Sequence, residues 1–287
     1  MITSTNRLKK NSHAFRMLTG ITAKKFDEIL AELKPIYETW YHDKLLRRER
    51  KRAPRSGYDF ELELEDRLLM LLMYYRTYVT HVFLGFLFRM DSSNVCRNIN
   101  PLQPLLAKIF RIPEKKIELS EDEITDLFFD GTEQPTNRPK RKQKKWYSGK
   151  KKRHTIKHQV VVTKLKKEGE RTRIRIKAVS KAFCGKTHDK EIYTRTRTTS
   201  PPRTPGYGDK GYQGTSLTIP YKKPRGALLT DVQKEWNRIH SSVRIVVEHG
   251  IGKMKIWKMA SERYRNKRNH HTVMMKNIAG LQNMMYA

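Results

Sequence analysis

The first forty residues are patterned as a helix. Thr22 can cap it, and Pro35 is expected to stop it, because proline cannot continue the backbone hydrogen bonds of a helix interior. Between these two residues the apolar side chains recur at helical spacing, which predicts one buried face. They are Phe26, Ile29, Leu30 and Leu33.

Residues 62–111 contain three further helical patterns, at 62–75, at 82–88 and after a break at 89–91. Asp91 can cap the third helix, in which Val95 and Ile99 lie one turn apart and face inward. A short helix, a tight turn and a helix with a polar outer face are typical of a helix-turn-helix, whose second helix can enter a major groove. Small bundles that bind no DNA show the same spacing. The outward-facing residues are Ser92, Ser93, Asn94 and Arg97.

After Pro113 the pattern changes to strands. Residues 125–130 form a short apolar run that ends on the carboxylate of Asp130. Residues 158–164 contain three consecutive valines, and residues 173–179 alternate basic and apolar side chains, as a half-buried strand does. A glycine-containing turn at 166–170 predicts that these two strands form an antiparallel hairpin.

The last third is patterned as helices. Thr230 and Gln233 have the spacing of a capping box, which predicts a helix start. One apolar face follows from there, and we expect all of it to be buried. It comprises Val232, Trp236, Ile239, Val243, Val246, Val247, Ile251 and Met254.

A polar stripe flanks this apolar face. At about 100° per residue, Glu248 lies about 40° around the helix from Arg244, and Lys255 lies about 20° from it. A carboxylate at the edge of a buried face, between two basic side chains, can face an active-site cleft. The same spacing also forms ion-pair ladders on the surface, and the spacing alone leaves both interpretations open.

The charge of the chain points to a polyanionic partner. The 287 residues include 61 Lys and Arg against 29 Asp and Glu, a net charge of +32. Such a charge opposes compaction and attracts a polyanion, with nucleic acid the first candidate and an anionic membrane surface the second. A basic run at 47–55 is interpreted either as a solvated linker or as a DNA contact.

A second basic run, at 138–153, holds ten Lys and Arg and no acid. We expect it to neutralise DNA phosphates. Its two aromatic residues either stack on an unpaired base or simply pack against the protein. The expected DNA contacts of this segment and its neighbour are Arg138, Lys140, Arg141, Lys142, Lys144, Lys145, Trp146, Tyr147, Lys150, Lys151, Lys152, Arg153 and His154.

Several classes of protein are disfavoured. The longest apolar stretches, at 68–75 and 82–88, are far shorter than the ~20 residues that span a bilayer. The N-terminus has no apolar segment of the kind found in signal peptides. Cys96 and Cys184 are the only cysteines, which argues against a disulfide scaffold or a zinc ribbon. We expect a reducing, cytoplasmic location, associated with the nucleoid if the source is a bacterium.

Four motifs taken together carry a family resemblance. They are Asp-Gly-Thr-Glu at 130–133, Tyr-Ser-Gly-Lys-Lys-Lys-x-His-Thr at 147–155, Asp-Lys-Gly-Tyr-Gln-Gly at 209–214 and Arg-x3-Glu-x6-Lys at 244–255. The chain resembles the DDE transposases of bacterial insertion sequences, in the branch related to the Harbinger elements. The resemblance implies an α+β fold, with an all-α helix-turn-helix-like domain followed by an RNase H-like α/β mixed-sheet catalytic domain. The expected divisions are an N-terminal helix and linker (1–57), the DNA-binding domain (58–117) and the catalytic domain (118–287).

The resemblance also assigns chemistry to residues. It implies that Asp130, Asp209 and Glu248 are the catalytic triad and hold two Mg²⁺ ions, with Mn²⁺ as a substitute. Only a fold can bring them together, since they are 209 − 130 = 79 and 248 − 209 = 39 positions apart. Metal-dependent hydrolysis and strand transfer would then move the element by a cut-and-paste route. The supporting residues would be Arg244, Lys255 and Glu133, the last either beside the site or stabilising a turn.

The implied partners are the terminal inverted repeats and target DNA, bound by a homo-oligomer of at least two copies and without a membrane. Asp189 is expected to cap a helix rather than to serve as a fourth ligand. The proline-rich segment before Asp209 predicts a short, irregular or edge strand, which leaves the activity of this copy open. The alternatives are a decayed or repurposed transposase that regulates without catalysis, and a nuclease that does not join strands.

Overall fold

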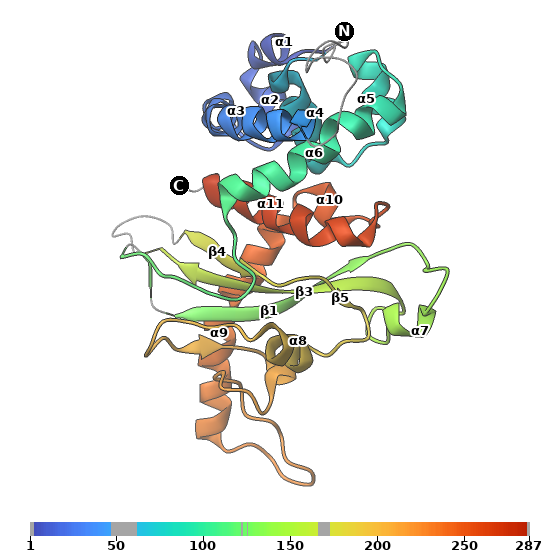
Figure 1. Ribbon diagram of the computed structural model, residues 1–287. Coiled ribbons are helices and arrows are strands. Elements are labelled where there is room, and N and C mark those ends of the chain that lie inside the picture. The colour runs from blue at the N-terminus through green and yellow to red at the C-terminus, as the bar shows by residue number, and fades with distance from the viewer. Residues whose placement is uncertain (1–2, 47–61, 122, 125, 166–172, 286–287) are drawn as a thin grey trace. The chain divides into compact units, whose positions relative to one another are not determined.

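The computed structural model describes residues 3–46, 62–121, 123–124, 126–165 and 173–285 (Figure 1). The basic run at 47–55, the turn at 166–170 and the expected division at 57/58 lie outside these ranges. The chain forms two compact units. The first comprises Met1–Arg111 with Trp257–Met259, and the second comprises Ile112–Ile256 with Ala260–Ala287.

The first unit is helical. Within it, α5 (His81–Phe88) and α6 (Ser92–Phe110) are joined by a tight turn in which Arg89 adopts a left-handed conformation. Val95 and Ile99 are fully buried on one side of α6. The opposite side is exposed at Ser92, Ser93 and Arg97, as the pattern predicted. The remaining described helices of this unit are α1 (Thr5–Lys9), α2 (Ser12–Thr19), α3 (Ala23–Leu46) and α4 (Leu64–Thr77).

Helix α3 runs through Pro35, so the prediction that it stops there is wrong. Proline removes one backbone hydrogen bond and crowds the preceding turn. The second half of the helix is nevertheless held by tertiary contacts. The guanidinium of buried Arg67 lies 4.9 Å from the ring of Tyr37 and donates a 2.6 Å hydrogen bond to its hydroxyl. Packing therefore outweighs the local cost, as it does for most helices in proteins.

The second unit is built on a mixed sheet. The first long strands form an antiparallel meander, in which Asp130 of β1 pairs with Val160 of β3 and Val160 pairs with Val179 of β4. Strand β6 pairs with β1 in parallel, while β2 and β5 pair with β3. The strands are β1 (Leu127–Pro135), β2 (Tyr147–Ser148), β3 (Arg153–Lys164), β4 (Ile174–Val179), β5 (Phe183–Cys184) and β6 (Gly206–Tyr207).

Helices cover both faces of the sheet. Gly250 of α9 (Asp231–Lys255) approaches β3 so closely that an added Cβ would lie 2.9 Å from Val162. On the opposite face, Phe129 of β1 packs edge-on against Tyr193 of α8 (Asp189–Thr196). Figure 1 shows α11 (His271–Met284) above the sheet and α8 below it. The shorter segments are α7 (Gln143–Trp146), η1 (Lys210–Tyr212), α10 (Lys258–Ser261) and η2 (Arg268–His270).

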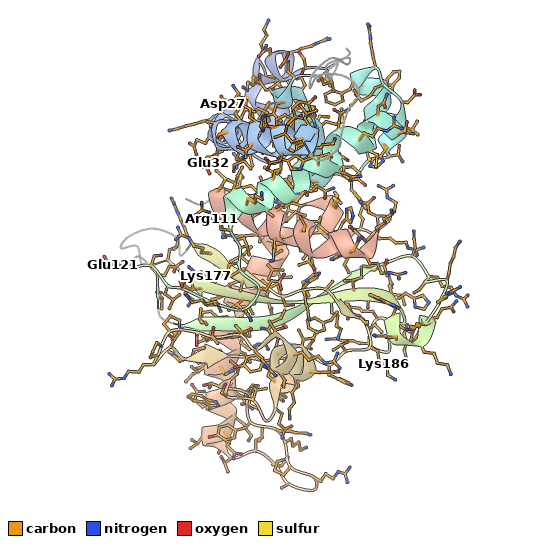
Figure 2. All side chains as sticks on the ribbon, viewed as in Figure 1. Asp27, Glu32, Arg111, Glu121, Lys177 and Lys186 are labelled. Atoms are coloured by element: carbon orange, nitrogen blue, oxygen red, sulfur yellow. The ribbon has the colours of Figure 1, made fainter. Side chains whose placement is uncertain are left out.

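The alternation predicted for residues 173–179 is confirmed. Ile174, Ile176 and Ala178 are buried on one side of β4. On the other side, the ammonium of Lys177 (Figure 2) lies 2.8 Å from the carboxylate of Glu123, which is itself fully buried. Arg175 also reaches Glu123, at 3.4 Å. These basic side chains are therefore engaged by an internal acid.

Helix α9 begins at the predicted capping box, in which Thr230 and Gln233 each accept the other's backbone N–H. Its apolar face, however, is buried only in the C-terminal half. Val247 and Met254 are buried, whereas Val232 is 80% exposed, Trp236 40% and Ile239 47%. The reason is visible in Figure 1, where the first half of α9 extends beyond the sheet. Periodicity identifies an apolar face but does not show what covers it.

The described helices include none that is long and apolar enough to cross a membrane.

Candidate active site

Asp130 lies in β1, with its side chain 22% exposed. Its Oδ1 accepts a 2.7 Å hydrogen bond from the backbone N–H of Gly131, and Nη2 of Arg244 lies 3.9 Å from its Oδ2. The pKa of this carboxyl is raised to about 6, mainly by burial and to a smaller extent by the negative charges of Asp209 and Asp189, against the lowering effects of Gly131 and Arg244. Loss of solvation is therefore the main reason that Asp130 resists ionisation, and the neighbouring aspartates add to it.

Asp209 is placed in the same region by β6, a strand of two residues. Tyr207 of β6 pairs in parallel with Phe128, so Asp209 and Asp130, each two residues further on, lie beside one another. The carboxylate of Asp209 caps η1 by accepting the backbone N–H of Gly211 at 2.8 Å. The proline-rich segment forms only a two-residue strand at the sheet edge, as its sequence predicted.

Asp189 is the residue that the sequence misassigned. His188 occupies the cap position of α8, and Asp189 makes no capping bond but extends its carboxylate over two glycines. A Cβ on Gly131 would lie 2.6 Å from Oδ1 of Asp189, and one on Gly211 would lie 3.5 Å from Oδ2. Burial raises the pKa of Asp189, and Asp209 raises it further against the lowering effects of Lys157 and Lys150. We call Asp130, Asp189 and Asp209 the acidic corner.

Two glycines in the motifs make this corner. Because neither residue carries a side chain, the carboxylate of Asp189 can pass directly over the backbone of β1 and of η1. The signal was present in the sequence as Asp-Gly at 130–131 and Asp-Lys-Gly at 209–211. The sequence alone does not show that these glycines lie against Asp189 at the start of α8, because Asp189 is 189 − 131 = 58 positions after Gly131.

Tyr212 adds an unusual donor beside the acidic corner. The side chain is 1% exposed, yet its hydroxyl makes no hydrogen bond with any described residue. Burial, followed by the charges of Asp189, Asp130 and Asp209, raises its pKa well above the ordinary value. A buried hydroxyl without a hydrogen-bond partner is costly and uncommon, so the Tyr212 hydroxyl can bind one more polar group beside the corner.

Helix α9 brings its polar stripe to the same strand. Arg244 contacts Asp130 rather than forming a surface ladder with Glu248. The pKa of Lys255 is also affected by the acidic residues nearby. Partial burial of its ammonium lowers this pKa and Lys151 lowers it further, whereas Asp130 and Glu133 raise it. Both basic residues of the stripe therefore interact electrostatically with Asp130.

Glu248 differs from the two aspartates of the expected triad. It lies on the α9 stripe between Arg244 and Lys255, but it is exposed and forms no hydrogen bond or ion pair with another described residue. Within the described ranges, no three His, Cys, Asp or Glu side chains have the arrangement that holds a metal ion. The structure thus brings Asp130 and Asp209 together with Asp189, and leaves Glu248 facing solvent.

Glu133 is a strand residue, so the interpretation that it stabilises a turn is wrong. It lies in β1 opposite Lys157 and accepts a hydrogen bond from the hydroxyl of Thr155. Its charge contributes to the raised pKa of Asp189. Glu133 therefore belongs to the surroundings of the acidic corner.

The basic segment at 138–153 is largely exposed. Its two aromatic residues behave differently: Trp146 lies under the guanidinium of Arg268 at 4.6 Å, whereas Tyr147 is 42% exposed and meets His154 edge-on. Trp146 thus has the packing role, and Tyr147 keeps an open surface.

Comparisons with known proteins match both parts of the chain. A family model described as DDE superfamily endonuclease matches residues 129–283, and one described as helix-turn-helix of DDE superfamily endonuclease matches residues 60–112. No solved structure matches the chain.

Two curated relatives extend over most of the sequence. The probable transposase for insertion sequence element IS702 of Microchaete diplosiphon is 31% identical, over 92% of this chain and 95% of the relative. The putative transposase for insertion sequence element IS112 of Streptomyces albus G is 33% identical, over 84% and 87%. With an acidic corner inside one matched region and a helix-turn-helix inside the other, this chain belongs to the DDE superfamily endonucleases, as a transposase of the insertion-sequence type.

Proposed function

We propose that this chain binds the terminal inverted repeats of its insertion sequence and moves the element by a cut-and-paste route. The observation that carries the proposal is the acidic corner, where Asp189 of α8 and Asp209 of the loop after β6 are close enough to raise the pKa of Asp130 on β1. Several carboxylates close together destabilise a fold, and groups with pKa values perturbed in this way cluster at catalytic sites.

The donor set fits divalent cations. Hard ions such as Mg²⁺ prefer oxygen ligands, and the corner offers carboxylates together with the unpaired hydroxyl of Tyr212. We assign two Mg²⁺ ions, or Mn²⁺ in their place, to Asp130 and Asp209 of the corner and to Glu248. The family motifs imply Glu248 as the third ligand, and it follows Arg244, the partner of Asp130, by one turn of α9. A pair of such ions activates water and stabilises the leaving oxygen of a phosphodiester.

The protein's own residues have separate tasks in this scheme. Arg244 balances part of the charge on Asp130, and Lys255 offers a second positive charge on the same stripe for the DNA phosphate. The first reaction, attack of water on the phosphodiester at the end of the element, frees a 3′-hydroxyl. In the second, that hydroxyl attacks a phosphodiester of target DNA and releases a target 3′-hydroxyl, so one bond forms for each bond broken.

DNA recognition is assigned to residues 58–117, after the N-terminal segment 1–57 and before the catalytic region 118–287. We infer that α6 enters a major groove, where its exposed polar residues read base edges. The exposure of Ser92, Ser93 and Arg97 supports this role. Asn94 accepts a 2.8 Å hydrogen bond from Arg97, which orients the guanidinium on the helix surface.

The active species is assigned as a homo-oligomer of at least two copies on DNA, because two ends must be joined together. The uncovered apolar residues in the first half of α9, Val232, Trp236 and Ile239, support a protein contact there. We place this activity on the chromosomal DNA of a bacterial cytoplasm.

The test is cleavage of a plasmid that carries the element's ends, with Mg²⁺ and the full-length protein. Asp130→Asn, Asp209→Asn and Glu248→Gln should each abolish nicking, whereas Asp126→Asn, a matched change four residues before Asp130, should leave it intact. Arg97→Ala should weaken binding about tenfold without changing the cut position. Binding without nicking would favour a regulator, and cut ends that never join a second duplex would favour a simple nuclease.

A further inference from the structure

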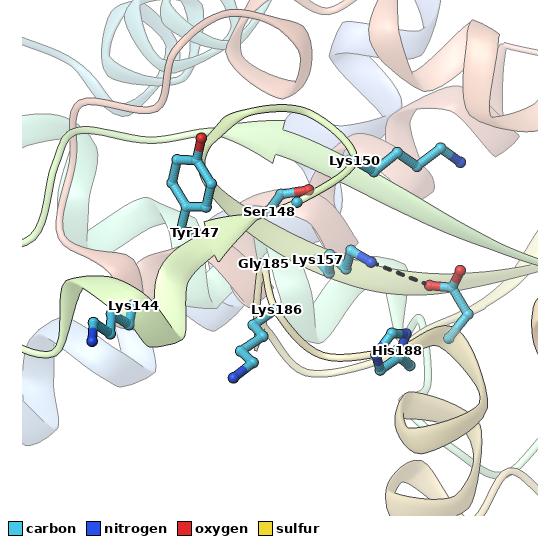
Figure 3. Close-up of a pocket in the computed structure, with 10 residues that line it drawn as sticks. Lys144, Tyr147, Ser148, Lys150, Lys157, Gly185, Lys186 and His188 are labelled. Atoms are coloured by element: carbon cyan, nitrogen blue, oxygen red, sulfur yellow. Dashed lines mark ion pairs between the residues drawn. The ribbon is translucent and has the colours of Figure 1, made fainter.

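A cavity of about 490 Å³ opens beside the acidic corner (Figure 3). Its walls come from α7 and β2, from β3 and from the loop that leads into α8. The lining includes the lysines Lys144, Lys150, Lys157 and Lys186, together with Tyr147 and Asp189. Four lysines and one carboxylate line the cavity, so it is strongly positive although the neighbouring corner is negative.

Three of the four lysines are available to a ligand. Lys157 is already held, because its ammonium donates to the carbonyl of Thr187 at 3.1 Å and lies 3.7 Å from Asp189. Lys144, Lys150 and Lys186 form no ion pair within the described part of the chain. Ammonium groups that share a cavity repel one another, and an anion with several oxygens relieves that repulsion.

The cavity also has an aromatic side. Tyr147 is 42% exposed and contacts His154 with the two rings nearly perpendicular, at 76°. Aromatic side chains beside a basic groove are the surfaces on which unpaired bases stack. The volume lies in the range of sites that enclose a small organic ligand, which is far more than a bare phosphate needs.

The cavity lies next to the acidic corner, where the proposed function places the phosphodiester that is cut. Asp189 lines the cavity and also belongs to the acidic corner, where its carboxylate lies over Gly131, the neighbour of Asp130. Figure 3 shows the ion pair that joins Lys157 to this carboxylate at the edge of the cavity. A strand with one phosphate at the corner would therefore have its adjacent nucleotide at the mouth of the cavity.

We propose that this cavity holds one unpaired nucleotide of the DNA strand being cut, with its phosphate among Lys144, Lys150 and Lys186 and its base against Tyr147. The inference rests on the proposed function, since it takes the phosphate next to the nucleotide to be the one at the acidic corner. A base inside a duplex is covered by its neighbours and must leave the stack to enter such a site. The cavity would therefore favour distorted or single-stranded DNA at the cleavage position.

Photo-cross-linking tests this inference without knowledge of the element's ends. The probe is an oligothymidylate with a single 5-iodo-2′-deoxyuridine, which couples to aromatic side chains on irradiation, mixed with the full-length protein. Mass spectrometry should locate the cross-link on Tyr147, with a yield at least about tenfold lower when the probe is fully paired. Tyr147→Leu should remove the cross-link, whereas Tyr221→Leu, which alters an exposed tyrosine outside the cavity, should not.

The lysines give a second measurement. Replacing Lys150 and Lys186 with Gln should reduce the slope of log affinity against log salt by about two, or about one for each phosphate that is no longer neutralised. Lys222→Gln with Lys223→Gln removes the same charge outside the cavity and should leave the cross-link to Tyr147 in place. A cross-link on another residue, or equal yields for paired and unpaired probes, would overturn the inference.

The two proposals fail differently. Asp130→Asn should stop nicking and leave the cross-link unchanged. If wild-type protein cross-links at Tyr147 but never nicks DNA under any metal condition, the proposed function fails and the nucleotide site stands. If Tyr147→Leu nicks DNA as fast as wild type and wild type cross-links elsewhere, the nucleotide site fails and the proposed function stands.

Discussion

Two polar clusters lie on strand β1, and they are built in opposite ways. One is the acidic corner around Asp130, where the charges of Asp209 and Asp189 raise the pKa of the Asp130 carboxyl. The other is a histidine network at Gln134. Nε2 of His271 lies 2.8 Å from Oε1 of Gln134, and Nδ1 of His271 lies 2.7 Å from Nε2 of His158. Nδ1 of His158 lies 2.6 Å from the carbonyl oxygen of Ser180. Gln134 also donates to the carbonyl of Glu262 at 2.6 Å.

The difference separates a structural cluster from a reactive one. Burial lowers the pKa of His158 to about 4 and that of His271 well below its ordinary value, and each ring has a polar neighbour at both of its nitrogens. The acidic corner instead keeps a carboxyl with a raised pKa and a hydroxyl with no partner among the described residues. Buried polar side chains that contact one another across several elements specify the fold, whereas clustered like charge marks a site that receives something else.

The largest effect should separate catalysis from folding. Asp130→Asn should lower the rate of nicking at least about a thousandfold, because it removes a charge that the transition state requires, while the protein remains folded. Nicking rates and urea unfolding of the same preparation measure both quantities. A variant that loses activity only because it unfolds would break the distinction between the clusters.

The histidine network should respond in the reverse manner. We expect His158→Ala to lower the free energy of unfolding by about 2–4 kcal/mol, since it leaves a cavity and orphans the nitrogen of His271. His249→Ala, which changes an exposed histidine on α9, should stay within about 0.5 kcal/mol of wild type. Urea unfolding at pH 7.5 distinguishes the two.

Acid should weaken the histidine network. The folded-state pKa of His158, about 4, lies below its ordinary value of 6.5, so the unfolded chain takes up the proton first as the pH falls. The contribution of uncharged His158 to the free energy of unfolding is complete above pH 6.5. It falls by about 2–3 kcal/mol as the pH is lowered towards 4. The measurement is the pH dependence of unfolding in wild type compared with His158→Gln, which should be flatter.

The acidic corner should show the opposite sign, and the smallest effect. The folded-state pKa of Asp130, about 6, lies above its ordinary value of 3.8, so its charge destabilises the fold fully above pH 6 and is relieved towards pH 4. Without metal, Asp130→Asn should therefore stabilise the protein by about 1–2 kcal/mol at pH 7.5 and by almost nothing at pH 4. Calorimetry in chelator tests this, and a variant less stable than wild type at pH 7.5 would contradict it.

Local pattern predicted much of the fold. The alternation of Ile174, Ile176 and Ala178, the capping box at Thr230 and the two-residue strand before Asp209 follow from side-chain periodicity, hydrogen-bonding geometry and the missing N–H groups of proline. These rules act over a few residues, so they can be read from a single sequence.

The failures all involve a distant neighbour. Pro35 stays in a helix because Arg67 packs on the following turn, and Trp236 is exposed because the sheet does not reach it. Asp189 looks like a helix cap in sequence, and only because Gly131 and Gly211 lack side chains can its carboxylate lie over their backbone, next to Asp130 in the chain. The pairing of Asp130 with Asp209 was implied by family motifs, and its physical basis is the parallel register of β6 on β1.

Trp257 limits how this protein can be dissected. The indole is 1% exposed and belongs to the first unit, where an added Cβ on Gly20 would lie 2.6 Å from it and the guanidinium of Arg76 lies 5.9 Å from its ring. A fragment that stops at Arg111 would lack this side chain and expose the surface it covers. The helices of the first unit therefore cannot be excised or exchanged by splicing at one point, and a transplanted unit must include residues 257–259.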